Sequence, residues 1–214
     1  MAVIGIMASG PVDHLPDLGM YQQEVDTWIA ADRGALTLIE KGVSVTYALG
    51  DFDSVTAEQR KIIQENATYF EAFPVEKDET DLEIAIQKAL GLRPEKVYLF
   101  GVTGGRFDHT FINTQLLNTI LDAGVRGIII DQWNQMELTK PGTHIIKDNE
   151  RYPYISFVPL TKEVTGISLK GFYYPLKDAA IAWGSTLCIS NKLIDEEGML
   201  DYETGMLLAI KSSD

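Results

Sequence analysis

Residues 27–54 read TWIAADRGALTLIEKGVSVTYALGDFDS, and their pattern indicates the fold class most clearly. Two short apolar runs, Thr27–Ala31 and Val45–Leu49, each end in a polar cluster: Asp32-Arg33-Gly34 after the first and Gly50-Asp51-Phe52-Asp53-Ser54 after the second. Short apolar runs that alternate with longer amphipathic segments are typical of parallel strands joined by helices. Because ligands bind beyond the carboxyl ends of the strands in open α/β sheets, the sequence predicts that both polar clusters line one binding edge.

The same alternation continues on both sides of this stretch. Further strands are predicted at residues 3–7, 96–101 and 127–130. Thr80 and Glu83 have the spacing of a capping box and predict a helix over about residues 80–91. A second helix is predicted to start with Asp108 as its cap and to stop at Gly124, and a third to run from Thr56 to about residue 66. Residues 1–140 are therefore predicted to form an α/β domain on a parallel sheet.

The sequence pattern changes after Lys140-Pro141-Gly142. Short segments of alternating hydrophobicity follow one another with turn residues between them, at residues 144–147, 154–158, 164–169, 186–190 and 206–211. Strands at this spacing, without a convincing helix, favour a small antiparallel β domain. We therefore predict a second domain over residues 141–214.

Charge and composition exclude several classes of partner. The chain has 214 residues with 18 Lys+Arg and 31 Asp+Glu, a formal charge of 18 − 31 = −13, so a nucleic-acid backbone is not an expected partner. Residues 1–140 hold 11 basic and 21 acidic residues, or 11 − 21 = −10. The single cysteine, Cys188, favours a reducing compartment, and no apolar run reaches membrane-spanning length. We expect a cytoplasmic protein without a membrane or nucleic-acid partner.

Two acidic clusters are candidate metal ligands. Asp51 and Asp53 point to the same side if their backbone is extended, and such oxygen ligands suit Mg²⁺, although a turn or cap role explains the same spacing equally well. Residues 76–83 are acidic at five of eight positions around a predicted helix start. These acids either complement the helix dipole or let Asp78 and Asp81 aim at the same metal as Asp51 and Asp53, with Lys77 contacting a phosphate.

A glycine-rich segment is the candidate phosphate site. Gly104-Gly105 offers backbone amides that an anion can approach closely, and the guanidinium of Arg106 suits phosphate oxygens. Asp108 has a cap as its alternative role, and His109 is more often structural than catalytic at such a position. Neither a Walker motif, a G-x-G-x-x-G motif nor a zinc spacing is present. Carboxylates for Mg²⁺ and a Gly/Arg phosphate grip indicate phosphoryl-type chemistry on a nucleotide.

In this order, the clusters resemble the thiamine pyrophosphokinase family. The matching segments are Ala31-Asp32-Arg33-Gly34-Ala35, Gly50 to Ser54, Asp78-Glu79-Thr80-Asp81, and Gly104-Gly105-Arg106-Phe107-Asp108-His109. Gly171 to Leu176 and Ser190-Asn191 are similar to that family's thiamine-binding domain. The resemblance implies a Rossmann-like catalytic domain, a C-terminal antiparallel β-sandwich, and a homodimer with its active site between the subunits.

The implied reaction is ATP + thiamine → AMP + thiamine diphosphate, with Mg²⁺. By resemblance, Asp51, Asp53 and one or both of Asp78 and Asp81 hold the metal. A carboxylate such as Asp81 is the candidate acceptor for the proton of the thiamine hydroxyl. By the same resemblance, Asp32 and Arg106 line the ATP and phosphate site. We expect that site also to include Arg33, Gly34, Lys77, Gly104, Gly105, Asp108 and His109. The implied thiamine contacts are Tyr174, Ser190 and Asn191.

The chain departs from the family pattern at two positions. Arg33 replaces a second glycine and is either a phosphate contact or a surface charge. Tyr174 stands where many members have Trp, and its ring can still stack on a cationic ligand. Trp183 follows nearby, and a place in the core competes with ligand contact there. Two other functions compete with the kinase: a Mg²⁺-dependent phosphohydrolase, and a noncatalytic regulator that binds a nucleotide or thiamine.

Overall fold

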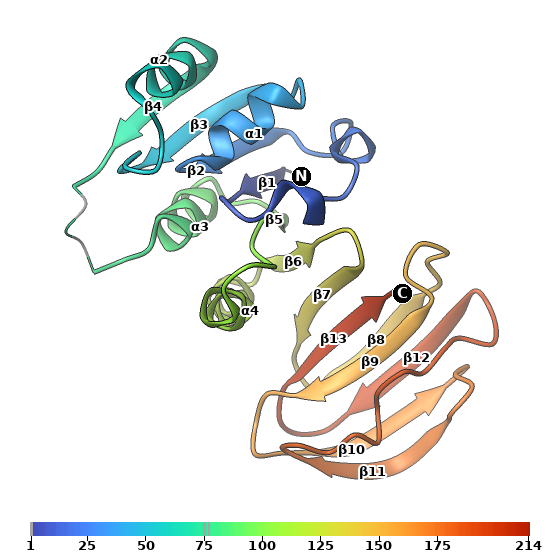
Figure 1. The fold of residues 1–214 in the computed structure, drawn as a ribbon. Helices are drawn as coiled ribbons and strands as arrows, with labels where there is room; N and C mark the ends of the chain where they lie inside the picture. Colours follow the sequence, from blue (N-terminus) through green and yellow to red (C-terminus); the bar gives the residue numbers. More distant parts are fainter. Residues whose placement is uncertain (1, 75, 77) are drawn as a thin grey trace. The chain divides into compact units, whose positions relative to one another are not determined.

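The structure is a computed structural model that describes residues 2–74, 76 and 78–214. The chain divides into two compact units, Met1–Gln132 (unit 1) and Trp133–Asp214 (unit 2), which are drawn in Figure 1. Among the residues that the structure describes, no helix is both long enough and apolar enough to cross a membrane.

Unit 1 alternates strands with helices along the chain, as the sequence predicts. Its elements are β1 (Val3–Met7), η1 (Val12–His14), η2 (Leu18–Met20), β2 (Thr27–Ala31), α1 (Gly34–Glu40), β3 (Val45–Gly50), α2 (Ala57–Asn66), β4 (Ala67–Ala72), α3 (Asp81–Gly91), β5 (Lys96–Phe100), α4 (Phe107–Asp122) and β6 (Arg126–Ile130). The strands lie in the order β4-β3-β2-β1-β5-β6, and each neighbouring pair is parallel. This arrangement confirms the predicted parallel-sheet fold.

The sequence explains where these elements form. All five residues of β1 are buried, as expected for a central strand covered by helices on both faces. Thr56 caps α2 in a reciprocal capping box with Gln59, and the Thr80 hydroxyl caps α3 by accepting a hydrogen bond from the Glu83 N–H. Helix α1 packs beside α2, and α3 beside α4, so one helix pair covers each face of the sheet (Figure 1).

The strand order creates a binding position at the centre of the sheet. The chain runs outward from β1 through β2 and β3 to β4, then returns to the other side of β1 to form β5 and β6. At such a reversal, the loops after the two central strands diverge to opposite faces and leave a crevice between them. The loops after β1 and β5 therefore flank the expected ligand position of unit 1.

Unit 2 is an antiparallel β-sandwich. Its strands are β7 (Asn134–Thr139), β8 (Gly142–Lys147), β9 (Tyr154–Pro159), β10 (Glu163–Lys170), β11 (Leu176–Ala182), β12 (Glu197–Tyr202) and β13 (Leu207–Ser212). Within unit 2, strands β7, β13 and β9 are hydrogen-bonded neighbours in one layer, and strands β11, β10, β12 and β8 follow one another in the other. Phe157 and Leu207 from the first sheet pack in one buried cluster with Leu169 and Leu200 from the second. The predicted antiparallel domain is thereby confirmed.

Some local predictions differ from the structure. Residues 186–190 form turns instead of the predicted strand, since the Cys188 carbonyl accepts a single hydrogen bond from the Phe157 N–H and the Ile189 N–H closes back on Thr186. The sequence did not indicate α1, β4, β7, β11 or β12. Strand β7 belongs to unit 2 and begins at Asn134, ahead of the sequence-based boundary at residues 140/141, because it pairs with β13.

Candidate active site

A cleft of about 890 Å³ lies at the carboxyl ends of the central strands of unit 1. Residues 8–11 after β1 and residues 101–106 after β5 form two of its walls, and the first residues of α3 and α4 close the others. Helix N-termini present unpaired N–H groups and partial positive charge, which favour anionic ligands. The cleft thus lies at the position where the strand order reverses and combines features that suit a phosphate-bearing molecule.

Three carboxylates gather beside this cleft, and we call them the acidic triad: Asp32, Asp51 and Asp53. Asp32 directly follows β2, and Asp51 directly follows β3. One ligand oxygen from each lies within 4.8 Å of the others, and they are the one such group of three among residues 2–74, 76 and 78–214. The Ser54 hydroxyl donates a 2.6 Å hydrogen bond to Oδ2 of Asp32. Oδ1 of Asp32 is buried and has no hydrogen-bond partner among the described residues.

The negative charges of the acidic triad repel one another, and this repulsion shifts the pKa of Asp53. The negative charge of Asp51 raises the pKa of the Asp53 carboxyl, and Asp32 and Asp81 raise it further. Asp81 reaches this field from the first turn of α3, on another wall of the cleft. A bound cation would relieve the repulsion among these acids, whereas a purely structural cluster would keep it.

Phe52 fixes the two aspartates on either side of it. Its backbone has φ +58°, a left-handed conformation that is rare for a bulky residue, and its side chain is only 3% exposed. The ring stacks on Phe70 of β4 with centroids 4.6 Å apart, and the Arg60 guanidinium lies 5.8 and 5.7 Å from the two ring centroids. With Phe52 anchored in the core, the Asp53 N–H donates to Oδ1 of Asp51 over 3.1 Å. A strained turn held by core packing often marks a functional site.

The glycine-rich loop after β5, for which the sequence predicts phosphate binding, lines the cleft. Gly104 and Gly105 have φ values of +84° and +66°, a region where glycine is favoured, and both line the cleft. Arg106 also lines it, but its guanidinium is paired with Asp108 through a 2.5 Å Nη2–Oδ2 contact and a 3.1 Å Nε–Oδ1 contact. This pairing lowers the pKa of Asp108.

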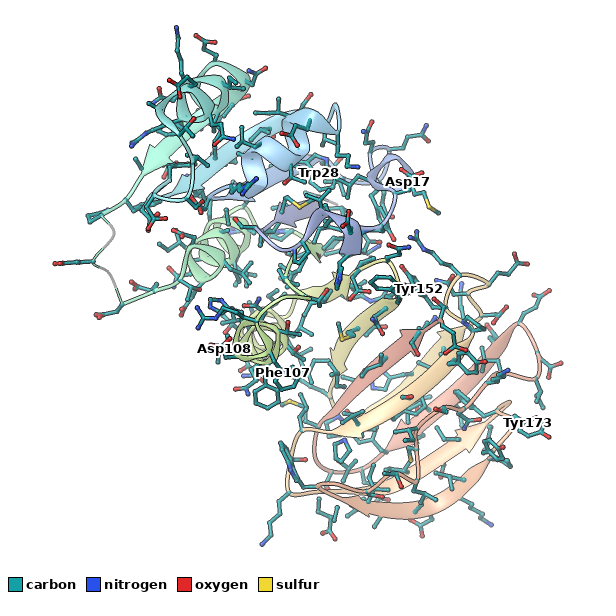
Figure 2. The ribbon with its side chains drawn as sticks, in the orientation of Figure 1. Asp17, Trp28, Phe107, Asp108, Tyr152 and Tyr173 are labelled. Atoms are coloured by element: carbon teal, nitrogen blue, oxygen red, sulfur yellow. The ribbon has the colours of Figure 1, made fainter. Side chains whose placement is uncertain are left out.

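The predicted role of Asp108 as a helix cap is wrong. Helix α4 begins at Phe107, so the N-cap position falls on Arg106, which makes no side-chain cap. Asp108 lies one residue inside the helix, where it binds Arg106, and its side chain projects away from α4 (Figure 2). His109 follows it on the wall of the cleft with an exposed side chain.

Other predicted residues of unit 1 lie apart from the triad. Arg33 lines a second pocket of about 240 Å³ together with Thr37 and Glu40. Gly34 is buried, and a Cβ at this position would lie 2.3 Å from the Met7 carbonyl oxygen, so its place is fixed by the close approach of α1 to β1. Asp78 is exposed and belongs neither to the triad nor to the described lining of the cleft. Lys77 lies outside the residues that the structure describes.

The three predicted thiamine contacts lie in unit 2. Asn191 is 3% exposed, and its side chain accepts a 3.0 Å hydrogen bond from the Tyr174 N–H and donates a 2.9 Å bond to the Tyr174 carbonyl. The Tyr174 side chain is 60% exposed and packs edge-to-face on Tyr173. Ser190 is exposed with φ +56°, and Trp183 is exposed beyond β11. Asn191 thus holds the backbone from which Tyr174 projects, and Trp183 is not a core residue.

Sequence reasoning missed the membership of Asp32 in the triad and the wall at residues 8–11. The signal for Asp32 was present, because it follows β2 as Asp51 follows β3, and Ala31 pairs with Leu49 in adjacent parallel strands. Ser9-Gly10-Pro11 likewise follows a predicted strand. Thr103 and Asn113, which also line the cleft, carried no recognisable motif.

Comparison with known proteins covers both units. The family model described as thiamin pyrophosphokinase, catalytic domain, matches residues 18–129, and the one described as thiamin pyrophosphokinase, vitamin B1 binding domain, matches residues 143–207. A thiamine pyrophosphokinase from Bacillus subtilis (strain 168) is 40% identical over 214 residues, all of both chains.

Solved structures agree with these matches. A crystal structure of thiamine pyrophosphokinase from Bacillus subtilis superposes with a TM-score of 0.94 at 40% identity over 99% of each chain. A thiamin pyrophosphokinase from Geobacillus thermodenitrificans gives 0.90 at 40% identity over 99% of this chain and 98% of that one. The enzyme from Candida albicans, at 16% identity, shares the fold with a TM-score of 0.82 over 99% of this chain and 89% of that one.

Proposed function

Because the chain belongs to the thiamin pyrophosphokinase family and is a thiamine diphosphokinase, we propose that the cleft of unit 1 is where ATP reacts. The observation that most strongly supports this function is the full-length match, at 40% identity, to a thiamine pyrophosphokinase. The placement of the acidic triad and the glycine-rich loop at one cleft supports the location. In the reaction, the thiamine hydroxyl oxygen attacks the β-phosphorus of ATP, the bond from that phosphorus to the α,β-bridging oxygen breaks, and AMP leaves.

We propose Mg²⁺ as the cation that the acidic triad holds. The donor set fits, because Asp32, Asp51 and Asp53 supply hard carboxylate oxygens within 4.8 Å of one another. The buried Oδ1 of Asp32 also lacks a hydrogen-bond donor among the described residues, which suits an oxygen that binds a cation. Bound Mg²⁺ would neutralise charge on the polyphosphate oxygens. Asp78, a sequence-based alternative, has less support, because it lies outside the triad.

The remaining cleft residues have roles that follow from their positions. Gly104 and Gly105 allow an anion to approach the backbone, and Arg106 neutralises charge that develops on the phosphates. Arg106 must share or exchange its Asp108 partner when a phosphate binds. We assign proton removal from the thiamine hydroxyl to Asp81, which lines the same cleft at the start of α3. The positive helix end beside it favours the phosphates.

We propose that unit 2 recognises thiamine through Tyr174. Its exposed ring can stack on a cationic heterocycle, while buried Asn191 fixes the backbone that carries it. By family resemblance, we propose a homodimer in which the catalytic unit of one subunit and the β unit of the other share each active site. The single, buried cysteine favours a cytoplasmic location, which forms part of the same proposal.

Product stoichiometry tests the proposed reaction. The full chain is incubated with ATP, Mg²⁺ and thiamine, and nucleotides and thiamine phosphates are separated and quantified. We expect AMP and thiamine diphosphate in a 1:1 ratio. ADP as the main product would refute diphosphoryl transfer, phosphate release without thiamine would indicate a phosphohydrolase, and binding without turnover would indicate a regulator.

A complementation experiment tests the shared site. Asp51→Asn and Tyr174→Ala variants are mixed under conditions in which subunits exchange. If the site is formed by two subunits, the mixed dimer has one site free of both substitutions, and part of the activity returns. No recovery after demonstrated exchange would place the whole site within one chain.

A further inference from the structure

The loop of residues 101–106 is rich in glycine, so contacts with other segments must hold its conformation. Gly101, Gly104 and Gly105 all have positive φ, and glycine-rich backbone is the most freely moving in a chain. Two contacts hold the beginning of the loop: the Gly10 N–H donates to the Gly101 carbonyl over 2.8 Å, and the Asn113 amide donates to the Val102 carbonyl over 2.9 Å. Both contacts precede the residues that would meet a phosphate.

A third contact holds the loop directly before Gly104. The Thr103 hydroxyl donates a 2.7 Å hydrogen bond to Oδ2 of Asp131, the residue that follows β6. Thr103 is 7% exposed and Asp131 is 4% exposed, so solvent does not compete for this bond. Thr103 lines the cleft, whereas Asp131 is not among the described residues that do. Asp131 therefore holds Thr103 from the side away from the cleft and has no direct access to a ligand.

The residues after β6 also hold His14, which contacts the other side of the loop. The N–H of Gln132, next to Asp131, donates a 2.7 Å hydrogen bond to the His14 carbonyl. The His14 ring lies against Gly104, where a Cβ would come within 2.4 Å of Nδ1. The segment 131–132 thus anchors Thr103 through a side chain and His14 through the backbone, and these two residues enclose Gly104.

We infer that Asp131 is a positioning residue for diphosphoryl transfer, which acts through the Thr103 hydroxyl to hold Gly104, Gly105 and Arg106 at the phosphate-binding wall. This inference rests on the proposed function. Burial of a carboxyl group is unfavourable unless it is hydrogen-bonded, and an apolar pair of similar shape fills a purely structural position at least as well. Misplacing a binding group by about 1 Å can reduce the rate about 10²-fold. We therefore assign the Thr103–Asp131 hydrogen bond to holding the geometry of the loop of residues 101–106.

Kinetics of hydroxyl variants test the inference. Thr103→Val keeps the shape of the side chain and removes the hydroxyl, whereas Thr103→Ser retains the hydroxyl as the matched control. We expect Thr103→Val to lower kcat/KM for ATP at least about tenfold, a loss of about 1.4 kcal/mol in transition-state binding. We expect KM for thiamine to change little and Thr103→Ser to stay close to wild type. Asp131→Asn should act in the same direction, and the double variant should lose no more than the worse single variant.

Several outcomes would overturn the inference. A Thr103→Val enzyme with reduced Tm but wild-type kcat/KM for ATP would show a purely structural bond, and additive losses in the double variant would show that the two residues act separately. If Thr103→Val does not fold, Asp131→Asn takes its place in the same comparison. If the wild type makes no AMP, the proposed function fails, and calorimetric titration with ATP and Mg²⁺ then decides the inference: equal ATP affinity in Thr103→Val and Thr103→Ser would refute it.

Discussion

Gly10 is the position where one added methyl group should most clearly uncouple the two walls of the cleft. Its N–H donates to the Gly101 carbonyl over 2.8 Å, and a Cβ at residue 10 would lie 2.4 Å from the same oxygen and 2.7 Å from its carbon. Both atoms belong to the backbone, so no side chain can turn aside. Real Cβ contacts essentially never fall below 3.0 Å, and the loops must therefore separate by at least 3.0 − 2.4 = 0.6 Å.

The expected cost of Gly10→Ala follows from this separation. Overpacking of a well-packed interior costs about 1–3 kcal/mol of unfolding free energy. A shift approaching 1 Å in groups that bind the reacting phosphates costs up to about 10²-fold in rate. We therefore expect Gly10→Ala to lower kcat/KM for ATP by about 10- to 100-fold, a larger effect than its loss of stability alone would produce in a protein that stays folded.

Steady-state kinetics and urea unfolding measure the two effects separately. Gly91→Ala is the matched control, because Gly91 ends α3, has no positive φ and has nothing within 4 Å of an added Cβ. The same methyl group should there be neutral or stabilise the protein by up to about 1 kcal/mol, with wild-type kinetics. Wild-type kcat/KM for ATP in Gly10→Ala would refute the view that the contact between the two loops sets the geometry of the cleft.

Three further predictions concern the triad and the thiamine contact. Asp53→Asn should raise the Tm of the metal-free protein, because it removes repulsion from Asp51, yet lower kcat about 10²-fold or more; unchanged turnover would remove Asp53 from the metal site. The pKa of Asp53 is raised in the folded state, so the folded state binds more protons than the unfolded state while the pH rises from about 3.8 through that raised pKa. Over this range the stability of the metal-free wild type should fall relative to Asp53→Asn and then level off. A Tm difference that does not vary with pH would contradict this. Tyr174→Ala should raise KM for thiamine more than KM for ATP, whereas Tyr69→Ala, at an exposed tyrosine of β4 in unit 1, should not; the reverse pattern would place Tyr174 outside the thiamine site.

The elements that the sequence predicted well share a simple physical signal. Strands β1, β2, β3, β5 and β6 are short buried runs bounded by turn residues, and each starts and ends within a residue of its predicted limits. Strand β4, ATYFEA, lies at the edge of the sheet and is half exposed, so it lacks a continuous apolar run. Helix α1 spans only seven residues, of which the first five are buried, and it therefore shows no amphipathic period.

The sequence predicted the separate clusters of the site but did not predict which of their residues come together. The clusters at residues 50–54 and 104–109 follow strands, so their common edge could be inferred from the sequence. The joining of Asp32 to Asp51 depends on β2 and β3 being neighbours in register, which is a tertiary fact. The strand predicted at 186–190 failed for a related reason: Leu187 and Ile189 alternate with Cys188 as in a strand, but only Cys188 is buried.

We propose that Asp32, Asp51 and Asp53 act together as a metal site. Binding of Mn²⁺, a probe for Mg²⁺, can be measured by the loss of the free-ion paramagnetic resonance signal in the wild type, in Asp32→Asn and in the control Asp78→Asn. We predict that Asp32→Asn weakens Mn²⁺ binding at least about tenfold, whereas Asp78→Asn leaves it close to wild type. Wild-type affinity in Asp32→Asn, or a larger loss in Asp78→Asn, would contradict the claim.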